Sequence, residues 1–154
     1  MTDRKIHWTA EELMFHVFPP IPWIVPNLLT SGLTLLVGAP KLGKSWLALA
    51  IGYAVSVGGA VLSKIKVPEH DVLYLALEDT PRRLQSRLEK IGATPSTRFH
   101  IATEWKPGQE GIQWLHRWME KHPETKLIIV DTWGRWSSVR DGNDYGEVTA
   151  QAAA

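Results

Sequence analysis

The sequence predicts an α/β fold in which helices cover both faces of a mostly parallel central sheet. Three short runs are apolar throughout instead of alternating, as strands buried on both faces are. These runs are residues 33–37, 72–77 and 127–130. Segments with helical spacing separate them, and alternation of strands and helices is typical of parallel sheets with right-handed crossovers.

The first two predicted helices have clear ends. A segment rich in Ala and Leu, residues 44–57, follows the first strand directly and stops at Gly58-Gly59. The second helix has Thr80 as its N-cap, Pro81 at its first position and Gly92 as its end. On this second helix, one face carries the apolar residues Leu84, Leu88 and Ile91.

Two further elements complete the alternation. A weaker strand is predicted over residues 99–102, and a third helix over residues 110–121. The third helix would place Ile112, Leu115 and Met119 inward and stop at His122-Pro123. The strand at residues 127–130 then follows it.

The chain divides into an N-terminal segment and a core. Residues 1–30 do not join the alternation, and their prolines predict an extended or partly helical apron laid over the core of residues 31–154. Residues 145–154 look like the opening of a helix without a C-cap or a following strand. We therefore expect a chain cut inside an element at its C-terminus, and a frayed terminal helix is the alternative.

Composition excludes several classes of protein. Because 17 Lys and Arg oppose 16 Asp and Glu, a large sequence-independent nucleic-acid surface is not expected. The absence of cysteine excludes disulfides, thiolate metal sites and a cysteine nucleophile, and the six histidines show no ligand spacing for zinc. No apolar run approaches the ~18 residues of a membrane span and no signal segment opens the chain, which predicts a cytoplasmic protein without membrane contact.

The strongest motif is Gly-Ala-Pro-Lys-Leu-Gly-Lys-Ser at residues 38–45, between a predicted strand and a predicted helix. This spacing is typical of a P-loop, whose backbone N–H groups surround a phosphate chain at the positive end of a helix. Glycine at 38 and 43 would supply conformations and closeness that a Cβ forbids. The alternative is a chance glycine turn with a surface lysine.

Each residue of this loop has an expected place. Lys44 would reach the β- and γ-phosphates of ATP, and the Ser45 hydroxyl would ligate Mg²⁺. Lys41 is expected to face solvent more than to act as a second phosphate ligand. The predicted nucleotide contacts in the motif are Gly38, Ala39, Pro40, Lys41, Leu42, Gly43, Lys44 and Ser45.

Two carboxylates follow predicted strands. Asp131 ends the run at residues 127–130, at the sheet edge where parallel sheets bind ligands, and is expected to hold the Mg²⁺ through a water. Glu78 follows the strand at residues 72–77 and could orient the water that attacks the γ-phosphate. Asp79 competes for that role. The alternatives are a turn-forming Asp131 and a solvated Glu78 at a strand end.

These motifs, with Trp46 after the P-loop serine and Arg82, Arg83 and Arg87 after Glu78, resemble the RecA-like AAA-type ATPases of plasmids and phages. Within that family, the sequence resembles the hexameric RepA-type replicative helicases over roughly residues 20–150. The resemblance implies a three-layer RecA-like fold and hydrolysis of Mg-ATP. It also implies single-stranded DNA and other copies of the chain as partners, giving a homohexamer.

The resemblance also assigns roles. Lys44 and Ser45 match the Walker A lysine and serine, Asp131 the Walker B aspartate and Glu78 the catalytic glutamate. Trp46 and Arg87 match positions near the nucleotide. The family core continues with further strands, a polar sensor residue, DNA-facing loops and an arginine finger, and these have no counterpart before Ala154.

Several tryptophans have two interpretations. Trp114 and Trp118 are one helical turn apart, and Trp133 and Trp136 flank Gly134-Arg135, so these four could stack on bases. Packing in a core is the alternative that we favour, and we expect Trp46 to be a core residue as well.

Three functions remain open from the sequence. The leading hypothesis is an ATP-hydrolysing module of a DNA replication or recombination motor. A nucleotide or small-molecule kinase shares the P-loop but would need an acceptor pocket and a mobile arginine lid. A nucleotide-binding fragment without turnover is the third hypothesis.

Overall fold

The computed structural model describes residues 6–137, and its centre is a three-stranded parallel sheet in the order β6-β5-β7. The strands are β5 (Asp71–Ala76), β6 (Phe99–Ala102) and β7 (Thr125–Asp131). Strands β5 and β7 were predicted from their apolar runs and β6 as a weaker strand, and the parallel pairing confirms the α/β class. The expected helix over residues 145–154 lies outside the described residues.

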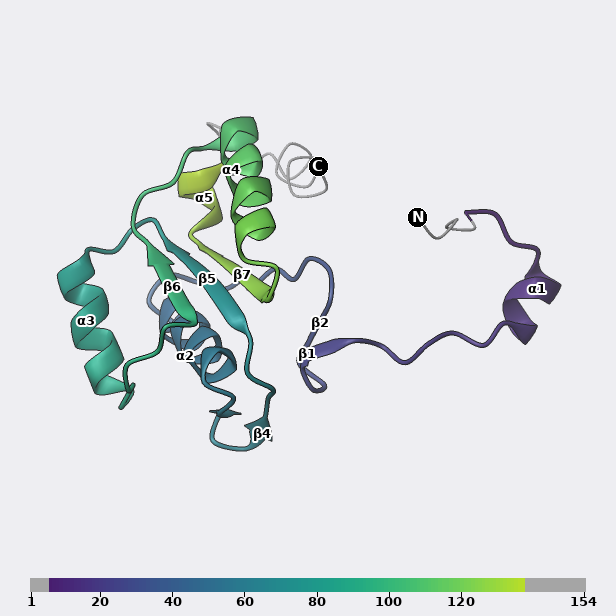
Figure 1. Cartoon of the computed structure of the whole chain (residues 1–154), viewed down its shortest axis with the longest axis horizontal. Helices are drawn as coiled ribbons and strands as arrows, with labels where there is room; N and C mark the ends of the chain where they lie inside the picture. The colour runs from purple at the N-terminus through teal and green to yellow at the C-terminus, as the bar shows by residue number, and fades with distance from the viewer. Residues whose placement is uncertain (1–5, 138–154) are drawn as a thin grey trace.

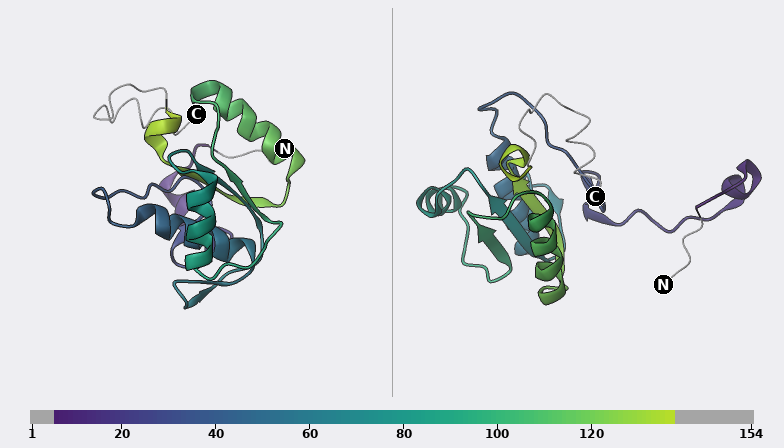
Figure 2. Two further views of the ribbon diagram at one scale, coloured as in Figure 1. Left: turned by 90° about the vertical axis from the view of Figure 1, so that its left-hand side faces the viewer. Right: turned by 90° about the horizontal axis from the view of Figure 1, so that it is seen from above.

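Helices flank the sheet on both faces (Figures 1 and 2). The side chains of Val72, Tyr74 and Ala76 point to the face covered by α2 (Lys44–Ser56) and α3 (Pro81–Lys90). Because side chains alternate along a strand, Leu73 and Leu75 point to the opposite face, where α4 (Gly108–Lys121) lies. Residues Val72 to Ala76 are almost completely buried, which explains their continuous apolar run.

The predicted helix boundaries are largely confirmed. Helix α2 begins at Lys44, and α3 has Thr80 as N-cap with Pro81 at its first position and Gly92, at φ 70°, just beyond its end. Helix α4 starts two residues before the predicted position. Met119 on α4 is 41% exposed, so the prediction that it points inward is wrong. Close packing here is supplied by Gly111, where an added Cβ would lie 2.1 Å from the carbonyl oxygen of Lys106.

The strand predicted over residues 33–37 is not present. These residues lie outside the sheet, and the side chains of Leu33, Leu35 and Val37 are 63%, 58% and 84% exposed. Both edges of β5 are occupied by β6 and β7, and among residues 6–137 no strand pairs with residues 33–37. An apolar run shows that a segment favours burial. Whether it becomes a buried strand depends on a neighbouring strand, which the run itself does not specify.

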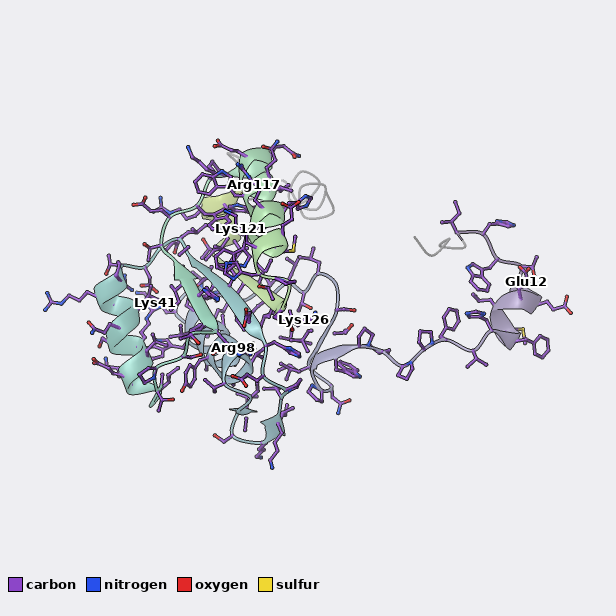
Figure 3. All side chains as sticks on the ribbon, in the orientation of Figure 1. Glu12, Lys41, Arg98, Arg117, Lys121 and Lys126 are labelled. Atoms are coloured by element: carbon purple, nitrogen blue, oxygen red, sulfur yellow. The ribbon has the colours of Figure 1, made fainter. Side chains whose placement is uncertain are left out.

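The N-terminal segment is organised differently from the prediction. Residues 6–22, which include the short helix α1 (Ala10–Phe15), project away from the rest of the molecule, and the side chains of α1 point into open space (Figures 1 and 3). Only from the hairpin of β1 (Trp23–Val25) and β2 (Leu29–Thr30) onward does this segment reach the core, where Val25 is fully buried. The expectation of an apron laid over the core is therefore wrong for residues 6–22.

Two short elements were not predicted. An antiparallel hairpin joins β3 (Ala60–Val61) to β4 (Ile65–Lys66) between α2 and β5, and α5 (Trp133–Trp136) follows β7 after one residue. The turn of that hairpin places Leu62 and Ser63 at positive φ, which non-glycine residues rarely adopt. Neither element shows the periodicity from which a longer helix or strand is recognised.

Candidate functional site

The predicted P-loop leads into the N-terminus of α2. Gly43 is the N-cap in the left-handed region at φ 83°, a conformation that favours glycine, and no side chain caps the first turn. The amides of the first turn have no partner within the helix, and the helix dipole places partial positive charge there. Such a helix end favours an anion, and phosphate is the usual one.

Lys44 bends back over the loop. Its Nζ donates hydrogen bonds of 2.8 Å to the carbonyl oxygen of Gly38 and 2.9 Å to that of Ala39. The ammonium therefore lies over the start of the loop. A Cβ at Gly38 would make only ordinary contacts, at 3.5 Å from Leu42 Cδ1, so crowding within the chain does not require glycine there. Of the two glycines, only Gly43 has a backbone conformation that favours glycine.

Asp131 is held from two sides at the end of β7. Ser45 donates a hydrogen bond of 3.1 Å from Oγ to Asp131 Oδ1, and Tyr74 donates one of 2.6 Å from its hydroxyl to Oδ2. Burial, and then the hydrogen bond to Asp131, raise the pKa of Tyr74 far above its usual value, so the phenol remains a donor. The sequence analysis missed Tyr74. The sequence feature that could have revealed it is a tyrosine within an otherwise apolar, buried strand, because a buried phenol hydroxyl needs a hydrogen-bond partner.

Glu78 lies next to this pair, in the turn after β5. Its Oε1 accepts a hydrogen bond of 2.9 Å from Thr132 Oγ1, and Arg135 Nε is 3.7 Å from the same oxygen. The Glu78 side chain is 54% exposed. A backbone hydrogen bond of 2.7 Å from Leu77 to the carbonyl of Asp131 holds the two strand ends together. Thr132 is a second residue that the sequence analysis missed.

Asp79 has different partners from Glu78. Its side chain is 7% exposed and forms ion pairs with Arg83, at 3.2 Å, and with Arg87. The two adjacent acids are thus sorted by environment: Asp79 is paired with two arginines of α3, whereas Glu78 stays at the exposed strand end. This arrangement favours Glu78 for any role that requires contact with water.

Arg87 also connects α3 to the P-loop helix. Its guanidinium carbon lies 5.4 Å from the centre of the Trp46 ring, a cation–π distance. Trp46 is 37% exposed, so the expectation of a core residue is wrong. Because Trp46 directly follows Ser45, the contact with its ring places Arg87, a residue of α3 predicted to lie near the nucleotide, close to the P-loop. The charge of Arg87 is balanced there by Asp79.

The tryptophans predicted to pack do so in part. Trp136 is buried and makes a T-shaped contact with Trp133, and Trp118 stacks on His122. Trp114 lies at 36% exposure against Trp105. Packing therefore accounts for Trp118, Trp133 and Trp136 better than a base-stacking surface does.

The donor set at the strand ends fits a hard cation. The Ser45 hydroxyl and the Asp131 carboxylate are oxygen donors within hydrogen-bonding distance of each other, and Ser45 lies in the first turn of α2. Mg²⁺ prefers such oxygen ligands and is usually shared with phosphate in sites of this type. The two residues separated by 86 positions in sequence thus form one group at the carboxyl edge of the sheet.

Comparison with known proteins agrees with this geometry. A family model described as an AAA domain matches residues 3–154, nearly the whole chain. No solved structure matches the chain. Within residues 6–137, none of the helices combines the length and the apolar character required to cross a bilayer. The match covers the loop, Glu78 and Asp131 together, and the chain belongs to the AAA family of nucleotide-binding P-loop ATPase domains.

Proposed function

We propose that this protein binds Mg-ATP at the P-loop and hydrolyses it, as the RecA-like ATPase module of a DNA replication or recombination motor. The observation that carries the nucleotide site is the 3.1 Å contact between Ser45 and Asp131, which joins the loop to the end of β7. A chance glycine turn would have no reason to place its serine on a strand-end carboxylate.

Binding is assigned to the loop and its lysine. The first-turn amides of α2 would hold phosphate oxygens, and Lys44 would exchange its two carbonyl contacts for contacts to the β- and γ-phosphates. Ser45 and Asp131 would hold Mg²⁺, which when bound neutralises charge on the phosphates. Ala39, Pro40, Lys41 and Leu42 would contribute backbone around the phosphates.

Hydrolysis is assigned to Glu78. The Thr132 hydroxyl donates to its Oε1 and so orients the carboxylate beside Asp131, where it could accept a proton from an attacking water. Trp46 and Arg87 would border the nucleotide, with Arg87 held against the indole ring and Asp79. In this proposal Glu78 serves turnover alone, whereas Lys44 is a catalytic residue that also binds the β- and γ-phosphates.

The motor function, single-stranded DNA as a partner, assembly into a hexamer and a cytoplasmic location rest on the resemblance to RepA-type helicases. The response to single-stranded DNA and the presence of turnover distinguish this proposal from the two rival functions. A kinase would transfer phosphoryl groups to a small acceptor and be indifferent to DNA. A fragment that only binds nucleotide would show no turnover with or without DNA.

The test compares ATP binding with ATP hydrolysis in the Glu78→Gln protein. We expect unchanged binding of Mg-ATP by calorimetry and a loss of turnover of about 100-fold or more, because a positioned base contributes on that scale. Glu120→Gln, an exposed acid on α4, is the matched control and should behave like the wild type. Turnover by Glu78→Gln at the wild-type rate would overturn the assignment, and single-stranded DNA should stimulate the wild-type protein.

A further inference from the structure

A second group of potential ligands lies at the opposite end of the sheet from the P-loop. Asp71 is the first residue of β5, His100 lies in β6, and His122 follows α4 just before β7. Asp131 ends β7 beside Ala76, and Ala76 lies five positions after Asp71 along β5. At the rise of a β-strand that is about 17 Å, so this group is separate from the nucleotide site.

The parallel register explains why these residues meet. His100 is paired with Leu73, and Asp71 is two residues before Leu73 on the same strand. Side chains two residues apart point to the same face, so Asp71 and His100 both face α4. The C-terminus of α4 then brings His122 over them, with the two imidazole rings 4.9 Å apart.

The distances suit a common ion. One ligand atom from each of Asp71, His100 and His122 lies within 4.8 Å of the others. Nitrogen and oxygen ligands around a tetrahedral zinc ion are roughly 3.4 Å apart, given bond lengths near 2.1 Å. Small rotations of the side chains would therefore close the group around a cation, and all three residues are partly buried.

Neighbouring groups orient the ligands. Trp118 stacks on His122, with ring centres 3.8 Å apart at 13°, and makes a T-shaped contact with His100 at 4.8 Å. Asp71 Oδ1 accepts a hydrogen bond of 2.9 Å from Arg98, which also pairs with Glu69 at 3.1 Å. Figure 3 labels Arg98 near this end of the sheet. Such supporting contacts orient metal ligands, and they leave the second carboxylate oxygen of Asp71 for an ion.

We propose that Asp71, His100 and His122 form a site for a divalent transition metal of the zinc class. Two imidazoles and a carboxylate are ligands that suit Zn²⁺, and three protein ligands leave a fourth position for water. A bound ion would connect β5, the edge strand β6 and the segment between α4 and β7.

The experiment is titration of the untagged full chain with Co²⁺, followed by the visible absorption of the bound ion. Excess Mg²⁺ is present so that oxygen sites at the P-loop are filled. We expect one Co²⁺ per chain, displaced by Zn²⁺, with at least a tenfold loss of affinity in both His100→Ala and His122→Ala. His116→Ala, an exposed histidine on α4, is the matched control and should bind like the wild type.

Several outcomes would overturn the site. These are absence of Co²⁺ absorption in the wild type, equal binding by the His100→Ala and His122→Ala double variant, or loss of binding in His116→Ala. Circular dichroism checks that each variant is folded, and Asp71→Asn provides a milder change if an alanine variant is not. Lys44→Ala should keep full Co²⁺ affinity, which separates this site from the nucleotide site.

Discussion

The hydroxyl of Tyr74 and the carboxylate of Asp131 are joined by a hydrogen bond of 2.6 Å between adjacent strands, β5 and β7. This bond occupies one carboxylate oxygen, while Ser45 reaches the other at 3.1 Å. The predicted metal ligand is therefore oriented by a residue of the sheet interior. Changes at Tyr74 should affect both the stability of the sheet and the site at its edge.

Tyr74→Phe should lower the free energy of unfolding by about 1–3 kcal/mol, because a buried hydrogen bond to a charged group is lost. We expect Mg-ATP binding to weaken as well, since Asp131 loses its orientation. Urea denaturation and calorimetry measure the two effects. Tyr53→Phe is the matched control: it removes the exposed hydroxyl contacts with Thr94 and should leave Mg-ATP affinity unchanged. Unchanged stability and affinity in Tyr74→Phe would contradict this role.

Lys44→Ala should abolish detectable nucleotide binding, because it removes the ammonium that lies over the loop and belongs to the proposed phosphate site. Lys41→Ala removes a lysine from the same loop at positive φ and should weaken binding only slightly. Fluorescence titration with a labelled ATP analogue compares the two proteins. Equal losses in both would mean that loop charge matters and the position of Lys44 does not.

Gly111→Ala should destabilise the fold by about 1–3 kcal/mol, which is the usual cost of overpacking. The new Cβ would lie 2.1 Å from the backbone oxygen of Lys106 and 2.5 Å from Trp136 Nε1, and a backbone atom cannot move aside as a side chain does. Gln113→Ala, on the exposed side of α4, is the control and should be neutral within about 0.5 kcal/mol. Thermal denaturation measures both variants. Equal melting temperatures for Gly111→Ala and Gln113→Ala would show that α4 shifts to accommodate the new Cβ.

Acid should destabilise the protein in part through His100. Burial lowers its pKa in the folded state below the usual 6.5. The unfolded chain therefore binds more protons between the two values, so stability is present above about 6.5 and is lost as the pH falls toward the folded pKa. We expect His100→Asn to reduce the loss of unfolding free energy between about pH 8 and pH 5.5, measured with a chelator present. His116→Asn should keep the wild-type pH dependence.

Comparison of the predicted and observed elements shows where local pattern is sufficient. Helix α2 begins at Lys44 and α3 follows Thr80 and Pro81, because caps and glycine conformations are properties of neighbouring residues. Burial of β5 was likewise visible in its apolar run. The same pattern was misleading at residues 33–37, where no neighbouring strand is present among the described residues.

The sequence by itself determined the P-loop, the order of α2, β5, α3, β6, α4 and β7, and the acids that follow two strands. Only the tertiary structure decided which of these residues meet: Ser45 with Asp131, Tyr74 with Asp131, and Asp71 with two histidines that show no ligand spacing in the chain. The physical reason is range. Helix caps and glycine turns depend on dihedral angles within a few residues, whereas contacts across 86 or 57 positions depend on strand register and on how α4 packs over the sheet.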